Sequence, residues 1–471
     1  MKNVTDTATL GLLGLALYSV TAQSALHGDD VHALVSALEH GTLKHDKHVL
    51  YLWLMDGLWA LLRPLGLDAL DTLQAGSVLG GAVAMALLHR AALGLGLDRG
   101  RAALVTGYWA VCPGVLFFAT VEEIHGVFLP FAALTFLAFA ARTGAAARGA
   151  LTGAASGLAS SAHATGHLLA VLLVLWFWGR ASAPRRLTST VQFGLGLALT
   201  HGLAAAAVTA IFSDGAPAFG SQLGFALFTL PRTLSLTDHL EPLRVAWREG
   251  FLPLLPLSVG AVAALLRPSL RREAAIILLA TLVYLGATYL VLLGAYERGA
   301  YLLPLAFPAA WLTLRAVGSR RANALLLALA ATLSVGWHVA GDRPLQDPAL
   351  ASGMTAHHQQ EKFFLWCAGR RELDTLVCYR VPVPASSVHH LGFAPQLGIT
   401  YEMACHAFEM MLRDLRNADQ ALLISDDALA VLRRGGPVLG RLANEYLPAR
   451  YELERVENGA FVAHRVVPRA R

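Results

Sequence analysis

Two pairs of adjacent carboxylates stand in short polar segments between long apolar runs. Asp29 and Asp30 open the segment DDVHALVSALEHG, and Glu122 and Glu123 lie in the turn ATVEEIHG. A carboxylate such as Asp29 can act as a general base toward an acceptor hydroxyl. Carboxylates from the two segments together, Asp30 and Glu123, could hold a divalent cation such as Mg²⁺ or Mn²⁺. The alternatives are helix capping for the first pair and ordinary solvation for the second.

Cationic and imidazole side chains stand in three further segments. Lys47 and His48 belong to TLKHDKHVLYLW, His163 to GLASSAHATGHLL and Arg298 to YERGAYLLP. The first segment holds two of the four lysines of the chain, and such groups can stabilise the negative charge of a phosphate. The alternative is that these cations only anchor the ends of membrane spans. The candidate residues for binding a phosphate-bearing substrate are Lys47, His48, Glu122, Glu123, His163 and Arg298.

The elements that must hold these residues are apolar helices. Of the 471 residues, 55% are hydrophobic and 15% are charged, against about 25% charged in an ordinary soluble domain. Runs without Asp, Glu, Lys or Arg recur along the chain and, with a first apolar stretch, predict eleven membrane spans. These lie at about 8–26, 72–89, 102–119, 124–141, 149–161, 163–178, 188–212, 251–266, 274–294, 302–314 and 322–340. The net charge of +5 comes from scattered Arg clusters, which argues against nucleic acid as a partner.

Five of the linkers between these runs are rich in arginine, at residues 90–101, 142–148, 180–186, 267–272 and 315–321. All five fall on one side only if 49–62 is an interfacial helix and 149–178 is two short spans that turn near Ser160, Ser161 and His163. The excess of cations in cytoplasmic loops then places the N-terminus inside and the candidate residues outside. We expect an integral protein of a bacterial cytoplasmic (inner) membrane.

The segment after Asp30 is predicted to form an amphipathic helix. Val31, Leu34, Val35 and Leu38 have the spacing of one helical face, and Gly41 is a natural stop. We expect this helix to lie on a surface.

The chain divides into two predicted domains, a transmembrane domain at 1–341 and a small extracytoplasmic α/β domain at 342–471. In the second, TLVCYRV and ALLIS are strand-like, 400–416 and 427–434 are helical, and YELERVENGAFVAHRV is a hairpin that turns at Asn458–Gly459. Three cysteines there, Cys367, Cys378 and Cys405, permit one disulfide. The predicted fold class is mainly α, polytopic and transmembrane, with this α/β domain appended.

Over residues 8 to about 341 the sequence resembles the GT-C superfamily of membrane glycosyltransferases, especially protein O-mannosyltransferases and the bacterial aminoarabinose transferase. The resemblance rests on HGDDVHALVSALEHG, KHVLYLWL, ATVEEIHGVFLP, GLASSAHATGHLL and YERGAYLLPL in this order. It implies transfer of a sugar from a polyprenyl phosphate on the outer face, with inversion at the anomeric carbon. Asp29 matches the base, with Asp30 beside it, and Lys47 and Arg298 match cations near the donor phosphate.

The pattern also departs from the superfamily. His48–Val49 stands where many relatives have two prolines, and His163 or His167 lies where others place a lysine. The partners implied are a polyprenyl-phosphate-linked sugar, membrane lipid and an acceptor that is a glycan, a lipid or a protein. A transporter or flippase for a lipid-linked or small polar substrate is the alternative function. The spans of a coupled transporter ordinarily carry ionisable groups, whereas the spans predicted here have no Asp, Glu, Lys or Arg and only histidine.

Overall fold

The computed structural model describes residues 2–23, 31–39, 41, 50–163, 165–180, 183–211, 255, 257–291, 300–341, 347–367, 375, 388–390, 401–434 and 436–469. The chain divides into two compact units. The first contains Met1–Gln23 and Ala37–Asp342, and the second contains Ser24–Ser36 and Arg343–Arg471. Each unit has its own hydrophobic core.

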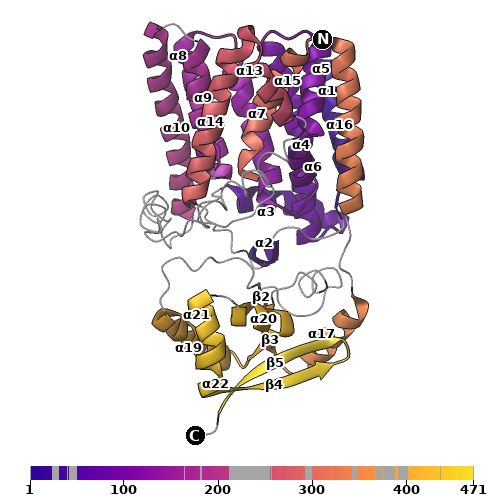
Figure 1. Cartoon of the computed structure of the whole chain (residues 1–471), viewed down its shortest axis with the longest axis vertical. Helices are drawn as coiled ribbons and strands as arrows, with labels where there is room; N and C mark the ends of the chain where they lie inside the picture. The colour runs from indigo at the N-terminus through magenta and orange to yellow at the C-terminus, as the bar shows by residue number, and fades with distance from the viewer. Residues whose placement is uncertain are drawn as a thin grey trace. The chain divides into compact units, whose positions relative to one another are not determined.

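The first unit is a bundle of helices that run side by side (Figure 1). Its helices are α1 (Lys2–Val20), α3 (Tyr51–Leu62), η1 (Arg63–Leu65), α4 (Ala69–Gly94), α5 (Arg99–Ala110), α6 (Pro113–Phe118), α7 (Ile124–Phe139), α8 (Ala145–Ala162), α9 (Gly166–Arg180), α10 (Ala183–Ile211), α13 (Leu257–Leu265), α14 (Pro268–Val291), η4 (Ala300–Leu302), α15 (Leu303–Val317) and α16 (Arg320–Gly341). A further helix, α2 (Val31–Glu39), lies between α1 and α3 in the sequence.

Several of these helices suit a bilayer. Within the described part of the chain, three are long and apolar enough to cross a membrane, at Ala69–Gly94, Arg186–Ala207 and Arg320–Ala340, and shorter apolar helices lie at Val4–Val20, Ile124–Phe139 and Leu303–Val317. Leucines along α10 and α16 are largely exposed, with Leu199 65% and Leu325 73% accessible. Such exposure suits contact with hydrocarbon. The prediction of a mainly α-helical fold is confirmed, and the apolar helices are consistent with a membrane protein. The number of spans stays a prediction.

The helix boundaries agree with two predictions, a separate short helix at 49–62 and a division of 149–178 into two helices. The segment from Val49 contributes one short helix, α3, and it is followed by η1 and a left-handed turn at Gly66. The run 149–178 forms two helices, because α8 ends at Ala162 and α9 begins at Gly166, with His163 extended between them. The amphipathic helix after Asp30 is also present as α2, and its four apolar positions, Val31, Leu34, Val35 and Leu38, are buried.

Small residues bring α8 and α10 into close contact. A Cβ added at Gly153 would collide with the backbone carbonyl of Phe193, and one added at Gly149 would collide with that of Ser189. Gly196 of α10 approaches the backbone of α8 at Ala150 in the same way. Glycines at such a contact allow two backbones to pack closely, which is how membrane helices associate when the surrounding lipid is as apolar as the side chains.

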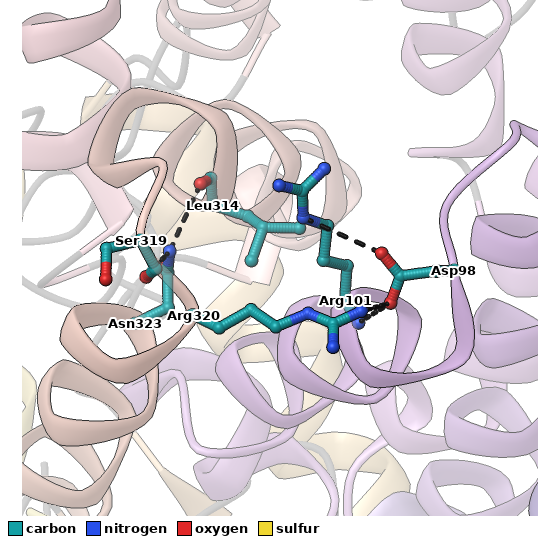
Figure 2. Close-up of polar contacts among 6 residues, drawn as sticks. All are labelled: Asp98, Arg101, Leu314, Ser319, Arg320 and Asn323. Atoms are coloured by element: carbon teal, nitrogen blue, oxygen red, sulfur yellow. Dashed lines mark hydrogen bonds and ion pairs between the residues drawn. The ribbon is translucent and has the colours of Figure 1, made fainter.

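The ends of the helices that carry the arginine-rich linkers meet at one end of the bundle, here called the basic end. Arg320 at the start of α16 pairs with Asp98 before α5, and Asp98 also accepts the backbone N–H of Arg101 at 3.1 Å (Figure 2). The Arg101 N–H and the Arg320 guanidinium lower the pKa of Asp98. Asn323 donates its side-chain amide to the carbonyl of Ser319 at 2.9 Å and so closes the α15–α16 turn.

Further contacts complete the basic end. Glu273 of α14 accepts the indole N–H of Trp176 at 2.9 Å and pairs with Arg315 at 2.8 Å, which joins the ends of α9 and α15 to the start of α14. Arg99 pairs with Asp6 of α1 at 3.4 Å. The basic linkers thus share one end of the bundle, as the argument about orientation requires. The side of the membrane on which this end lies stays a prediction.

The second unit is built on a mixed sheet of order β2-β1-β3-β5-β4. Its strands are β1 (Phe363–Cys367), β2 (Val388–His390), β3 (Ala421–Ser425), β4 (Tyr451–Asn458) and β5 (Phe461–Pro468). β1 is parallel to β2 and β3, and β5 is antiparallel to β3 and β4. Its helices are α17 (Pro348–Gln360), α19 (Tyr401–Asn417), α20 (Asp426–Arg434), α21 (Gly436–Arg441), η6 (Leu442–Tyr446) and α22 (Leu447–Arg450).

The two faces of this sheet pack against different helices because side chains alternate along each strand. Trp366 and Ile424 belong to the core formed with α19 and α20, whereas Phe363 and Leu423 belong to the core formed with α17. The predicted strand ALLIS, the two helices and the hairpin are present. In the hairpin Asn458 pairs with Phe461, which leaves Gly459 and Ala460 as the turn.

The second unit differs from the sequence-based expectation at β1 and at its cysteines. β1, with the sequence FFLWC, was not predicted, because a short continuous apolar run does not alternate and so carries no strand period. TLVCYRV lies outside the described residues apart from Thr375. Cys367 and Cys405 are buried and are not joined to each other, so a disulfide between these two is wrong, and Cys378 lies outside the described residues.

We expect Gly153→Leu to lower the thermal stability of the purified protein in detergent. The new side chain must displace the carbonyl of Phe193, and overpacking of this kind costs about 1–3 kcal/mol. The matched control is Gly202→Leu on α10, where an added Cβ meets nothing within 4 Å. Equal melting temperatures for the two variants would show that the α8–α10 contact is not tight.

Candidate functional site

The turn between α6 and α7 holds the acidic pair at the end of the bundle opposite the basic end. Glu122 is 4% exposed, and the side chain of Glu123 is 18% exposed. α6 ends at Phe118 and α7 begins at Ile124, so five residues make the turn. Burial of this degree contradicts the alternative in which both are ordinary solvated acids. A buried carboxylate needs polar partners or a bound cation, because its desolvation is costly.

Glycine and serine bring this turn close to α4. Gly126 lies against Ser77 and the carbonyl of Phe118, and a Cβ at Gly80 would collide with the carbonyl of Gly126. The Ser77 hydroxyl donates to the carbonyl of Glu123 at 3.2 Å. The first turn of α7 therefore lies directly against α4, which fixes where the two carboxylates emerge.

The side-chain amide of Gln74 on α4 joins three pieces of chain. Its Nε2 lies 2.6 Å from the carbonyl oxygen of Gln23, 3.2 Å from that of Thr120 and 3.3 Å from Oε1 of Glu122. The backbone N–H of Gln23 in turn donates to the carbonyl of Thr120 at 3.1 Å. The chain that leaves α1 is thus held beside the acidic turn.

His338 near the end of α16 adds a fourth element to this network. Its Nε2 lies 2.9 Å from Nε2 of Gln23, 3.0 Å from Oγ1 of Thr120 and 3.0 Å from the carbonyl oxygen of Thr21. Since both His338 and Gln23 are less than 10% exposed, these polar groups satisfy one another away from water.

Two imidazoles lie beside the carboxylates. His125 in the first turn of α7 has Nδ1 3.5 Å from Oε2 of Glu123, and its ring centroid is 4.2 Å from that of His163. His163 accepts the backbone N–H of Thr165 at 3.1 Å, and its Nδ1 lies 2.7 Å from the Thr165 hydroxyl. Both rings are buried, and Phe128 flanks His163. A buried pair of imidazoles next to a carboxylate can bind or move a proton.

Tyr51 brings a phenol to the same place. The backbone N–H of the preceding Leu50 donates to the carbonyl of Ser161, next to the loop that carries His163. Tyr51 is fully buried, and its hydroxyl makes no hydrogen bond within the described residues. Burial, together with the carboxylates of Glu123 and Glu122, raises the pKa of Tyr51 well above its ordinary value. The group is therefore a neutral hydroxyl at physiological pH.

The structure brings together three of the residues predicted for the site, Glu122, Glu123 and His163. The other five, Asp29, Asp30, Lys47, His48 and Arg298, lie outside the described residues. Over the described ranges, no group of three or more His, Cys, Asp or Glu side chains could hold a metal ion. Of the two predicted metal ligands, Asp30 and Glu123, the structure describes only Glu123. The described residues therefore do not form a cation site.

The sequence reasoning missed three residues of this region, Tyr51, Gln74 and His125. His125 had a local signal, because it follows the acidic pair in VEEIH. Tyr51 lies in KHVLYLWL, a segment that supports the resemblance, but was not singled out there. Gln74 had no signal, because it is a lone amide in an apolar helix. A histidine of the predicted spans, His201 on α10, has its Nδ1 2.9 Å from the Ser161 hydroxyl.

We expect Tyr51→Phe and Gln74→Leu to affect stability differently. Removing an unbonded buried hydroxyl should leave the free energy of unfolding unchanged or raise it, whereas loss of the Gln74 amide removes a hydrogen-bond donor from three oxygens and should cost about 1–3 kcal/mol. Thermal unfolding in detergent measures both. If Tyr51→Phe lowers the melting temperature as much as Gln74→Leu does, the phenol has a structural partner.

Comparisons with known proteins agree on the fold. No protein-family model matches the sequence, and no curated protein sequence matches it significantly. Among solved structures, ArnT from Cupriavidus metallidurans bound to undecaprenyl phosphate superposes with a TM-score of 0.58 at 14% identity, covering 97% of each chain.

Two further solved structures are similar. The oligosaccharyltransferase AglB from Archaeoglobus fulgidus, in complex with an inhibitory peptide and a dolichol-phosphate, gives a TM-score of 0.54 at 12% identity, over 98% of this chain and 74% of AglB. The mycobacterial arabinofuranosyltransferase AftD gives 0.51 at 16% identity, over 98% of this chain and 41% of AftD. This chain therefore shares the fold of these solved glycosyltransferases along nearly its whole length.

Proposed function

We propose that this protein is an integral membrane glycosyltransferase that moves a sugar from a polyprenyl-phosphate donor to an acceptor on the outer face, with inversion and with Asp29 as the general base. The observation that carries the proposal is the similarity of fold to ArnT bound to undecaprenyl phosphate, over 97% of both chains. AglB, also similar in fold, was solved with a dolichol-phosphate. Both ligands are isoprenoid phosphates.

The buried polar groups around Glu122 support this place for the chemistry. Glu122, Glu123, His125, His163 and Tyr51 converge at one end of the bundle, where a sugar offers hydroxyls to carboxylates and imidazoles. A donor with an isoprenoid tail stays in the bilayer and presents its sugar at the interface. An end of the bundle rich in buried polar groups, rather than its middle, suits such a donor.

Two of the remaining candidates are close in the sequence to described residues of this end. Asp29 follows Gln23, which bonds to Thr120, by six residues. Lys47 lies three residues before Leu50, whose backbone N–H donates to the carbonyl of Ser161. A chain of three residues spans at most about 10 Å.

The proposed reaction is a single displacement. The acceptor oxygen attacks the anomeric carbon, the bond from that carbon to the phosphate oxygen breaks, and the polyprenyl phosphate leaves with the electron pair. Asp29 takes the proton of the acceptor hydroxyl, which becomes acidic as the new bond forms. Lys47, His48 and Arg298 stabilise the departing phosphate, and Asp30 lies next to the base in the sequence.

A divalent cation such as Mg²⁺ or Mn²⁺ remains a subsidiary proposal. Glu123 would need Asp30, from outside the described residues, to complete a ligand set. No step of the proposed reaction depends on the cation.

We expect Asp29→Asn to lower sugar transfer from a polyprenyl phosphate by about 10²–10⁴, the usual contribution of a general base. The matched control is Glu39→Gln, which removes an exposed carboxylate at the end of α2. Transfer is measured with purified, normally folded protein. Undiminished transfer by Asp29→Asn would exclude Asp29 as the base.

We expect treatment with EDTA to reduce transfer if Asp30 and Glu123 hold a cation, and added Mg²⁺ or Mn²⁺ to restore it. The measurement is the transfer rate before chelation, after chelation and after metal is added back. A rate unchanged by EDTA would remove the cation from the proposal and leave the role of Asp29 intact.

A further inference from the structure

A cavity of about 630 Å³ opens at the basic end, between the last turns of α4 and α7 and the middle of α8. It is lined by Arg90, Leu93, Gly94, Leu134, Leu137, Ala138, Ala140, Ala141, Arg142, Leu151, Ala154, Ala155 and Leu158. The acidic turn lies at the opposite end of these helices, so the cavity is separate from the proposed site of transfer.

Some arginines of the basic end have an ion pair within the described residues, and the two of this cavity belong to those that have none. Arg99, Arg315 and Arg320 each pair with a described carboxylate. Within the described parts of the chain, no ion pair is found for Arg90 or Arg142, and no carboxylate lines the cavity. Two guanidinium groups thus border the same space with no anion of the protein to neutralise them, which makes the cavity complementary to an anionic group.

Close packing of small residues brings these arginines to the same cavity. A Cβ at Gly94 would lie 2.9 Å from the carbonyl oxygen of Ala140, so the last turn of α4 contacts the end of α7. Arg90 lies one turn before Gly94, and Arg142 lies two residues after Ala140.

The rest of the cavity is apolar and extends along the helices. Leu151 and Leu158 of α8 are seven residues apart, which is about 10 Å along a helix. Leu134 and Leu137 of α7 form the other wall, and Leu151 is 50% exposed. A charged mouth and an apolar wall that continues toward the middle of the bundle are the two features that an amphiphile with one anionic head requires.

We propose that this cavity binds an anionic membrane phospholipid, with its phosphate between Arg90 and Arg142 and an acyl chain along the leucines of α7 and α8. A free phosphate would leave the apolar walls uncovered, and a zwitterionic lipid would bring its own cation to two guanidinium groups. The cavity therefore selects for net negative charge together with a hydrocarbon chain.

The test is native mass spectrometry of the full-length protein in detergent, titrated with phosphatidylglycerol or with phosphatidylcholine. We expect phosphatidylglycerol to bind more tightly, and the double variant Arg90→Gln/Arg142→Gln to weaken its binding by about tenfold. The matched control, Arg272→Gln/Arg321→Gln, removes two exposed arginines of the same end that do not line the cavity, and it should bind as the unchanged protein does.

A second variant tests the apolar wall. Ala138→Phe fills the cavity and keeps both arginines, so it should also weaken phosphatidylglycerol binding, with folding checked by thermal unfolding. Equal affinity for the two lipids, or an equal effect of the two double variants, would overturn the proposal. Inorganic phosphate that displaces the lipid fully, or undecaprenyl phosphate that binds where phosphatidylglycerol does not, would overturn it as well.

Discussion

The amide of Gln74 is the interaction on which the acidic end of the helical bundle depends. Where a helix of an apolar bundle ends, its backbone groups need partners, and the interior offers no water to supply them. Gln74 meets this need for two such ends at once, because its Nε2 faces carbonyl oxygens of Gln23 and Thr120 as well as the carboxylate of Glu122. His338 also contacts Gln23 and Thr120. The chain after α1 and the turn before α7 therefore belong to one polar network inside an otherwise apolar unit.

Close packing at small residues decides how the helices around this network are spaced. Gly80 and Gly126 let α4 and α7 meet, and Gly149 and Gly153 let α8 meet α10. Lipid supplies no hydrophobic drive for helix association, so these backbone contacts supply much of the attraction. The same packing has opposite results at the two ends of α4. At one end it places buried carboxylates against histidines, and at the other it sets two arginines beside an open cavity.

Charge is handled differently at the two ends, and this difference connects the fold with its proposed function. At the basic end most described carboxylates are neutralised by arginine, as in the Asp98–Arg320 pair (Figure 2). At the other end, among the described residues, Glu122 contacts the amide of Gln74 and Glu123 lies beside the imidazole of His125, and both carboxylates raise the pKa of the Tyr51 phenol. Buried acids can contact the hydroxyls of a sugar or the ligand shell of a cation, as the proposed function requires.

The sequence alone determined the apolar helices, the single short helix at α3, the division into α8 and α9, the amphipathic face of α2 and the C-terminal hairpin. Each of these follows from a local period, a breaker or a turn residue such as Gly459. The acidic turn was also visible, as two carboxylates between uncharged runs. Only the tertiary structure decided that Glu122 is buried, that Gln74, Tyr51 and His125 surround it, and that Arg90 and Arg142 share a cavity. The physical reason is that burial and pairing depend on residues brought together from distant parts of the chain, which no local spacing records.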